Sequence, residues 1–451
     1  TLDAGAGQDS LKGGSGTNTY VLYTNAAGLY DDTIDISAGG HDIVVLGGQE
    51  GQLTQAQIDS VAVVGGAAPE LWNKPYTRDH TQTEDVATHG ASLTITVKDK
   101  EASLKQTVNL TIDGATLDAG GAVGEAGKIT LSASNVTLTN ATITSVAADG
   151  ITRGDIEITA DDSGRDWYNY VQAFGRSQIN SAKVTIIDSE IKGGDVEIKA
   201  QSSAIHLLPV KDTASFVGDV FLQDLTSSLA LDVSYVYARS TATVDIGSAN
   251  LTDDLKTEID AETLKVYADS GANGSATPWG IGLDLVVSQA HSEARLTIGE
   301  AAITSEGNVE LRATGEVEMN IEAEATGVKG VVGAIGIGVM TNKAVAQVED
   351  TASFRVGGDL AMFAQAEDNT RMVVAASTGS SEEKDPADPA GKKMRATTAG
   401  SAALGIGVLS ESTVVNAYFD GTAVVDGDVT ISAEQFQGKV PVERLLLIPS
   451  S

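Results

Sequence analysis

The chain has 451 residues and carries 29 lysines and arginines against 62 aspartates and glutamates, a formal net charge of −33. A surface this acidic repels nucleic acids and anionic lipids, whereas its carboxylates suit hard cations such as calcium. The absence of cysteine excludes disulfides, thiolate metal sites and cysteine catalysis. The longest apolar stretch, Val331–Met340, falls well short of the roughly 20 residues that a membrane-spanning helix needs.

The first predicted element is a short calcium-binding β-roll over residues 1–48. Residues 4–12 (AGAGQDSLK) and 13–22 (GGSGTNTYVL) fit the nonapeptide G-G-x-G-x-D-x-U-x, in which U is a large aliphatic residue. Glycines allow the tight turns of this motif, and the aliphatic residues, here Leu11 and Val21, are expected to face the interior. The predicted calcium ligands are Gly5, Gly7, Asp9, Gly14, Gly16 and Asn18.

These nonapeptides resemble the last repeats of an RTX-type β-roll, and residues 31–48 are similar to the segment that closes such rolls in secreted bacterial proteins. The resemblance implies that Asp9 is the strongest calcium ligand. Asn18 stands at the second aspartate position and is a weaker ligand, because its amide offers an oxygen without a charge. A Gly/Asp-rich loop that binds no ion is the alternative interpretation.

Residues 49–90 change character and predict a linker or an irregular cap. They contain a short stretch that fits a helix, then two prolines, few apolar residues and no period. His80 and His89 flank Glu84 and Asp85, but their spacing matches no metal-ligand pattern, so we expect solvated side chains.

From about residue 91, apolar residues occupy alternate positions and predict β-strands, in a first part over 91–227 and a second over 228–451. One sequence motif recurs: a glycine and a polar residue, followed by aliphatic-x-aliphatic-x-Ala. Its copies are GKITLSA (127–133), GDIEITA (154–160), GDVEIKA (194–200), GNVELRA (307–313), GDLAMFA (358–364) and GDVTISA (427–433), with a degenerate copy ETLKVYA (262–268).

A second recurring motif suggests longer repeats. Gly-Ile-Gly occurs at 280–282, 336–338 and 405–407, which predicts a period of about 55 residues once the charged segment 380–393 is treated as a loop insert. Residues 228–247 also align with residues 280–299, which adds an earlier and more divergent unit.

Short alternating strands with glycines at the corners favour a right-handed parallel β-solenoid that follows the β-roll. A β-sandwich array is the competing fold, but it would contain more aromatic residues than the 4% found here. The sequence pattern of the repeats over residues 91–435 resembles that of the passenger regions of large bacterial surface proteins, both filamentous-haemagglutinin-like and RTX-type adhesins. The resemblance implies a secreted or cell-surface protein. The N-terminal residues carry no signal-peptide pattern, so we interpret the chain as a piece exported without a cleaved leader of its own.

One local cluster could carry a ligand site. Residues 161–176 (DDSGRDWYNYVQAFGR) concentrate aromatic and acidic side chains in a chain that is poor in aromatics. Asp166, Trp167, Tyr168 and Tyr170 are the candidate glycan-binding residues, because aromatic faces stack on sugar rings. The alternative is a loop whose aromatic side chains simply cover the solenoid.

The functional expectation is a calcium-stabilised extracellular repeat protein without catalytic activity. It would mediate adhesion, matrix or filament assembly by binding copies of itself or cell-surface and matrix glycans, and not nucleic acid or a membrane. A carbohydrate-active β-helix enzyme, such as a polysaccharide lyase or uronate epimerase, or a sugar-binding module, is the alternative.

Overall fold

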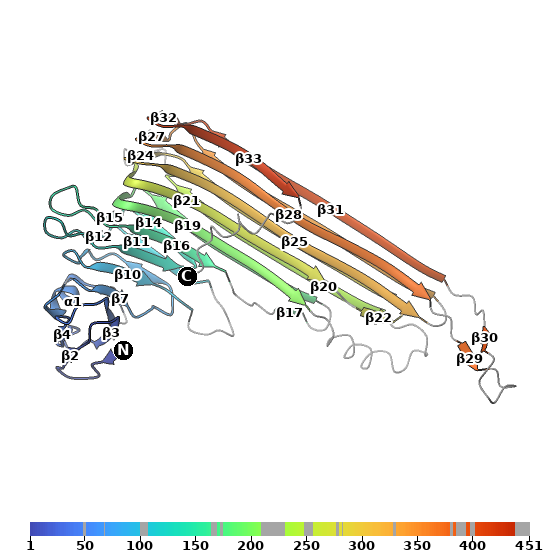
Figure 1. Cartoon of the computed structure of the whole chain (residues 1–451), viewed down its shortest axis with the longest axis horizontal. Helices are drawn as coiled ribbons and strands as arrows, with labels where there is room; N and C mark the ends of the chain where they lie inside the picture. Colours follow the sequence, from blue (N-terminus) through green and yellow to red (C-terminus); the bar gives the residue numbers. More distant parts are fainter. Residues whose placement is uncertain are drawn as a thin grey trace.

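The computed structural model describes residues 1–47, 51–66, 68–99, 107–163, 169–171, 175–208, 231–247, 256–276, 279–281, 283–327, 331–378, 382–384, 394–396 and 402–437. Over these residues the chain winds into a parallel β-solenoid whose strands lengthen from the N-terminal coils toward the C-terminal ones (Figure 1). The expected all-β solenoid class is therefore confirmed. Within this part of the chain, no helix has the length and apolar character needed to span a bilayer.

The first coils form two short parallel sheets. One contains β1 (Leu2–Asp3), β3 (Asn18–Tyr23), β5 (Asp42–Gly47) and β7 (Glu70–Asn73), and the other β2 (Ser10–Lys12), β4 (Thr33–Asp35) and β6 (Ala62–Val64). Leu2 pairs with Tyr20, a step of 18 residues that equals two nonapeptides. Tyr20 and Leu22 are fully buried, whereas Val21 is only half-buried. The strand alternation thus runs one residue out of the expected phase.

Residues 51–66 and 68–90, in a segment expected to form a linker or cap, instead build coils of the same solenoid. Their elements are α1 (Gln55–Ser60), β6, β7, β8 (His80–Gln82) and β9 (Val86–Ala87). β7 pairs on one side with β5 and on the other with β10 (Ser92–Thr96), so the sheet continues without a break. Strands of two to four residues are too short to show a period in the sequence, which explains why they were missed.

Three parallel ladders form the walls of the later coils. The first contains β8, β11 (Asn109–Asp113), β14 (Asn135–Thr139), β18 (Gly175–Ile187), β20 (Leu231–Ile246), β23 (Leu283–Ile298), β26 (Val331–Val348) and β31 (Ala402–Phe419). The second contains β10, β13 (Ile129–Ala133), β16 (Ile156–Asp162), β19 (Glu190–Leu208), β21 (Thr257–Ala276), β25 (Val309–Gly327), β28 (Leu360–Thr378) and β33 (Val429–Gln437). The third contains β9, β12 (Thr116–Asp118), β15 (Thr142–Thr144), β24 (Ala301–Ser305), β27 (Ser353–Val356) and β32 (Thr422–Val425), joined through the first residues of β19 and β21.

Three small elements lie beside these ladders. β17 (Asn169–Val171) pairs antiparallel with β18, β22 (Trp279–Ile281) pairs with the far end of β25, and β29 (Glu382–Lys384) forms a hairpin with β30 (Met394–Ala396). In Figure 1 the hairpin projects from the tip of the long strands.

The recurring motif that ends in alanine forms one continuous column of the second ladder. Successive copies pair in register from β13 to β33, so their final alanines stack in the order Ala133, Ala160, Ala200, Ala268, Ala313, Ala364 and Ala433. Neighbouring strands lie only about 4.8 Å apart, and a methyl group fits this spacing inside the coil. The prediction that these copies are equivalent positions of stacked coils is confirmed.

The coil step differs from the expected period of about 55 residues. Leu283 pairs with Gly333, a step of 50, and Val309 pairs with Leu360, a step of 51. The first two Gly-Ile-Gly copies are not equivalent, because Gly280 and Ile281 belong to β22, which pairs with β25, whereas residues 336–338 belong to β26 in the first ladder. The alignment of residues 228–247 with 280–299 is confirmed, since β20 and β23 pair with that offset.

Residues 380–393 interrupt the coil where the insert was expected. The step from β26 to β31 is 71 residues (Val331 to Ala402), and Glu382–Lys384 pairs only with Met394–Ala396 in the projecting hairpin. The rest of the insert lies outside the described residues. We predict that deleting Ser380–Lys393 leaves the thermal midpoint and the circular dichroism spectrum nearly unchanged, because its described residues, Glu382–Lys384, pair in the hairpin and not in a coil ladder. A loss of several degrees would show that this segment belongs to the core.

A polar seam divides the interior of the long coils into two apolar cores. One core fills the N-terminal coils and the parts of the later coils next to the third ladder. The other core lies between the parts of the long strands that are distant from that ladder. Two facing columns of inward polar residues separate them. They are Asn180, Ser240, Ser292, Asn342 and Thr413 on the first ladder, and Asp162, Ser202 and Ser270 on the second.

Candidate functional site

The first glycine turn brings two carboxylates together at the base of the roll. The backbone N–H of Asp9 donates to Asp32 Oδ1 at 2.8 Å, and the residues that follow, Ser10 and Thr33, pair in β2 and β4. Gly5 and Gly7 adopt positive φ angles of 71° and 120°, which let the chain turn before Asp9. Asp32 is 1% exposed, and its Oδ2 has no hydrogen-bond partner among the described residues.

The electrostatics of this turn favour a cation. Burial, followed by the nearby negative charges of Asp31 and Asp9, raises the pKa of Asp32, although the N–H of Asp9 opposes the shift. A bound cation would reverse this penalty, because it favours the charged carboxylate. Carboxylate oxygens such as those of Asp9 and Asp32 are ligands that calcium accepts.

The second glycine turn is already satisfied by a side-chain amide. Asn18 Nδ2 lies within hydrogen-bonding distance of the carbonyls of Gly14 and Gly16, at 2.7 and 3.0 Å, and of Asp42 Oδ1, at 2.8 Å. The oxygens that would face an ion thus receive hydrogen bonds from Asn18. Of the predicted ligands, Gly5, Gly7 and Asp9 stand beside Asp32 in the first turn, whereas Gly14, Gly16 and Asn18 bond to one another in the second. Calcium binding at either turn stays a prediction.

Sequence reasoning missed the acidic partners of both turns. Asp32 and Asp42 stand one coil after Asp9 and Asn18, and only the strand pairing reveals that they are neighbours. The Asp31-Asp32 pair before a short strand was the available signal. Among the described residues, no three histidine or acidic side chains converge as a metal-ligand set. An ion at the first turn would therefore depend on backbone carbonyls as well as on Asp9 and Asp32.

The predicted glycan-binding residues cannot be placed. Asp166, Trp167 and Tyr168 lie outside the described residues, and Tyr170 is described only as a backbone position of β17.

The expected solvated histidines have different environments. His80 is 7% exposed, and its ring stacks on Tyr76 with the ring centres 3.6 Å apart, so burial lowers its pKa. It was expected to be solvated, but β8 carries it into the sheet. His89 is exposed, as expected, and pairs with Asp59 at 3.4 Å.

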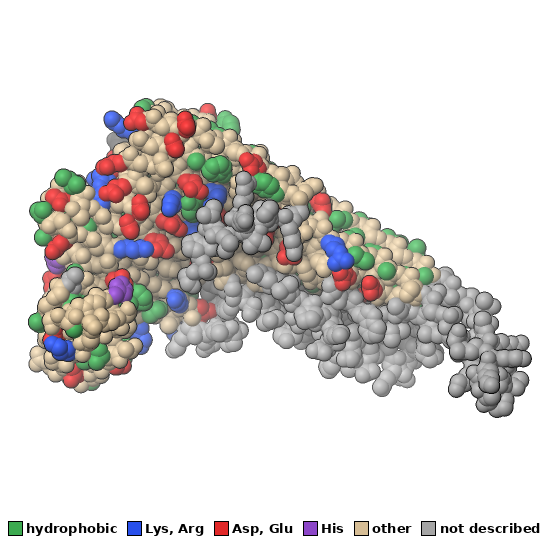
Figure 2. All heavy atoms as spheres, viewed as in Figure 1, with side chains coloured by type: hydrophobic (Ala, Val, Ile, Leu, Met, Phe, Trp, Pro, Cys, Tyr) green, Lys and Arg blue, Asp and Glu red, His purple; other side chains and the backbone are tan. Residues whose placement is uncertain are grey.

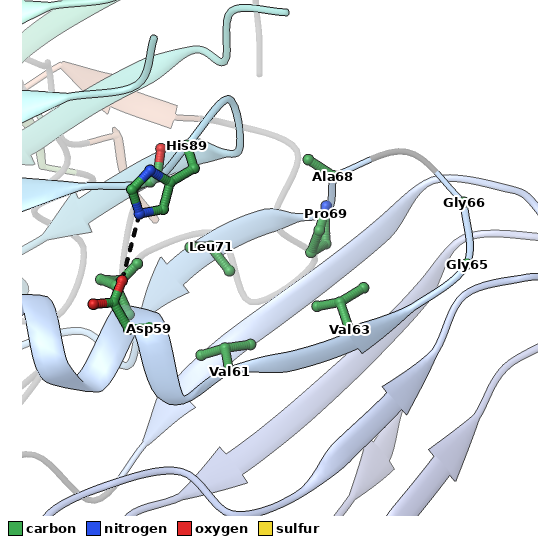
Figure 3. A pocket seen from close by; sticks show the side chains of 11 residues that line it. Asp59, Val61, Val63, Gly65, Gly66, Ala68, Pro69, Leu71 and His89 are labelled. Carbon is green, nitrogen blue, oxygen red and sulfur yellow. Dashed lines mark ion pairs between the residues drawn. The ribbon is translucent and has the colours of Figure 1, made fainter. Parts of the chain in front are cut away.

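A hollow of about 400 Å³ opens beside this ion pair, between α1, β6 and β7 (Figure 3). Figure 3 shows Asp59 and His89 facing one another at its rim, with Val61, Val63 and Leu71 along its wall. Asp59 and His89 are the ionisable side chains of its described lining, and both are more than half exposed. Water screens such a pair, so this ion pair contributes little to stability.

The last coil exposes residues that occupy core positions in the coil before it. Val429 pairs with Leu360 and Ile431 with Met362; the two partners are 1% and 0% exposed, whereas Val429 and Ile431 are 55% and 46% exposed. The outer edges of β31, β32 and β33 have no strand partner among the described residues. Figure 2 shows apolar side chains along this margin, while acidic side chains are scattered with lysines and arginines over the rest of the visible face.

No protein-family model, no curated protein and no solved structure matches this chain.

Proposed function

We propose that the chain is an extracellular structural and adhesive repeat protein that works by association, through the edge formed by β31, β32 and β33, which has no strand partner among the described residues. The observation that carries the proposal is the exposure of core-type residues there, Val429 and Ile431 with Leu409 at 40%. Burying such side chains is favourable by about 25 cal/mol for each Å² of apolar surface removed from water. A further β-coil laid on this edge would also pair its free backbone groups.

The chemistry of the edge suits pairing with another strand. Glu411 and Glu434 are the charged residues of β31, β32 and β33. Protected sheet edges usually carry lysines, prolines or bulges that discourage pairing, and these strands carry no lysine or proline.

Strand length favours a second copy that docks by the same edge. β1 at the first coil has 2 residues, whereas β31 has 18. A head-to-tail contact would leave most of β31 unpaired, while two last coils related by a two-fold axis match along their full length. The net charge of −33 opposes this contact. Divalent cations would screen that repulsion, so we expect association to rise with calcium and to fall with a chelator.

Sedimentation velocity tests the proposal. The chain is expected to form dimers or larger species whose proportion rises with protein concentration and with calcium. Val429→Lys with Ile431→Lys should return it to the monomer, because two ammonium groups cannot be buried in a pair of apolar edges. Thr430→Lys, one residue away on the outward face, is the matched control and should associate like the wild type. A wild-type chain that stays monomeric at high concentration, with and without calcium, would refute the proposal.

A further inference from the structure

A second surface, which faces outward from the wall of the solenoid, gathers cations in a chain that is strongly acidic. It lies on the outward face of β20, β23 and β26, where a hollow of about 240 Å³ is lined by Tyr237, Arg239, His291, Glu293, Thr341 and Lys343. Strand pairing fixes this arrangement: Arg239 lies opposite His291, which lies opposite Thr341, and in the next row Glu293 lies opposite Lys343.

The charges of this hollow are unevenly compensated. Lys343 Nζ pairs with Glu293 Oε1 at 2.8 Å, so these two charges neutralise each other. Arg239 is exposed and forms no ion pair with the described residues. Arg295, two residues beyond Glu293, donates its Nε to Thr297 Oγ1 and adds a second cation without a described carboxylate partner. The hollow thus carries a local positive surplus that suits an anion.

An aromatic ring and polar groups complete the hollow. The rings of Tyr237 and His291 lie 5.4 Å apart at an angle of 50°, and Tyr237 is half-buried. The Thr341 hydroxyl and the Glu293 carboxylate can exchange hydrogen bonds with ligand hydroxyls. The volume lies below the roughly 300–1,000 Å³ of sites for drug-sized ligands, so it suits one small ring rather than an extended molecule.

We propose that this face binds an anionic sugar unit, with its carboxylate or sulfate held by Arg239 beside His291 and its ring placed against Tyr237. A guanidinium matches the planar carboxylate and the sulfate through paired hydrogen bonds. The ring of Tyr237 accepts the apolar face of the sugar, and Glu293, Thr341 and Lys343 meet its hydroxyls. This site is independent of the assembly edge, and it requires no calcium.

The neighbourhood of His291 makes binding sensitive to pH. The ring faces Tyr237 and Arg239 on β20, Thr341 and Lys343 on β26, and Glu293 on its own strand. Burial, and then the charge of Arg239, lower the pKa of His291 below its usual 6.5. A bound anion would favour the protonated ring and raise that pKa, so by linkage the affinity should increase as the pH falls through this range.

The test follows the His291 ring by NMR in the full chain, whose five histidines can be assigned with His291→Gln. The probes are sodium glucuronate, glucose 6-sulfate, glucose and inorganic phosphate. Glucuronate and the sulfated sugar should each shift the His291 signal and raise its pKa, and glucose should do neither. If one of the two anionic sugars acts and the other does not, that result identifies the acidic group within the proposal.

Variants then assign the roles of the side chains. Arg239→Gln should weaken glucuronate binding by between about tenfold and about a hundredfold, the range for a lost hydrogen bond between charged groups. Arg355→Gln, at an exposed arginine of β27, is the matched control and should bind as the wild type does. Tyr237→Phe should retain binding and Tyr237→Ala should lose it several-fold.

Four results would overturn the proposal. They are equal binding of glucose, phosphate binding as tight as glucuronate, an unchanged affinity in Arg239→Gln, and no movement of the His291 signal with any probe at high millimolar concentration.

Discussion

Replacing Asn342 with leucine is expected to lower the free energy of unfolding by about 2–4 kcal/mol, because it breaks the most connected point of the polar seam. Asn342 Nδ2 lies within hydrogen-bonding distance of the carbonyls of Gly315 and Glu367, both at 3.0 Å, and of Asp368 Oδ1 at 2.7 Å. Asp368 is 6% exposed, so the variant leaves a buried carboxylate oxygen without this donor. Gly315 admits the contact, since a Cβ there would collide with the Asn342 side chain.

Urea unfolding measures this effect, and a neighbouring residue in the same column provides the control. Among the described residues, Ser292 Oγ bonds to Ser270 alone, to its Oγ at 3.0 Å and its carbonyl at 2.9 Å, so Ser292→Ala should cost at most about 1 kcal/mol. Asn342→Leu combined with Asp368→Leu should be less damaging than Asn342→Leu alone, because the buried carboxylate is removed with its partner. A loss in Asn342→Leu no larger than that in Ser292→Ala would show that the seam contributes little to stability.

The seam could in principle be found in the sequence, and its signal is weak for a physical reason. Ser240, Ser292 and Asn342 each stand between two alternation positions filled by apolar residues, as in Ala238-x-Ser240-x-Ala242. Serine also occurs on the outward faces of strands, so one polar residue at an inward position looks like a slip of register. Only the pairing of three coils shows that these residues share one column.

The solenoid class and the alanine column were predictable because each depends on one strand and its period of two. The number of residues per coil was not predictable, because it depends on which strand a motif belongs to. The same Gly-Ile-Gly motif occurs at β22 and in β26, which lie in different ladders. The pairing of carboxylates at the first glycine turn was half predictable for a similar reason. Asp9 comes from a local motif, whereas Asp32 reaches it only through the pairing of β2 with β4.

Calcium is expected to stabilise the N-terminal coils through the first turn only, and two opposite substitutions test this. A site that binds the folded chain alone adds about 1.4 kcal/mol when calcium is tenfold above its Kd. Asp32→Asn should abolish that gain. In EDTA it should leave the thermal midpoint equal to or above that of the wild type, because it removes a buried carboxylate whose raised pKa already makes its charged form unfavourable. With a folded pKa above the unfolded value, Asp32 favours folding at low pH and loses that contribution as the pH rises through the folded pKa.

The second turn provides the reciprocal variant. Asn18→Asp removes the amide that bonds to Gly14 and Gly16 and places a second carboxylate beside Asp42. In EDTA this variant should melt below the wild type, because two adjacent carboxylates repel and two carbonyls lose their donor. In millimolar calcium it should recover, with a larger calcium-dependent rise than the wild type shows, since the turn then has the oxygen set of the nonapeptide motif. Scanning calorimetry of the three chains with calcium and with EDTA distinguishes these cases. A wild-type midpoint that calcium does not move, together with an Asn18→Asp chain that calcium does not rescue, would mean that these turns are structural and bind no ion.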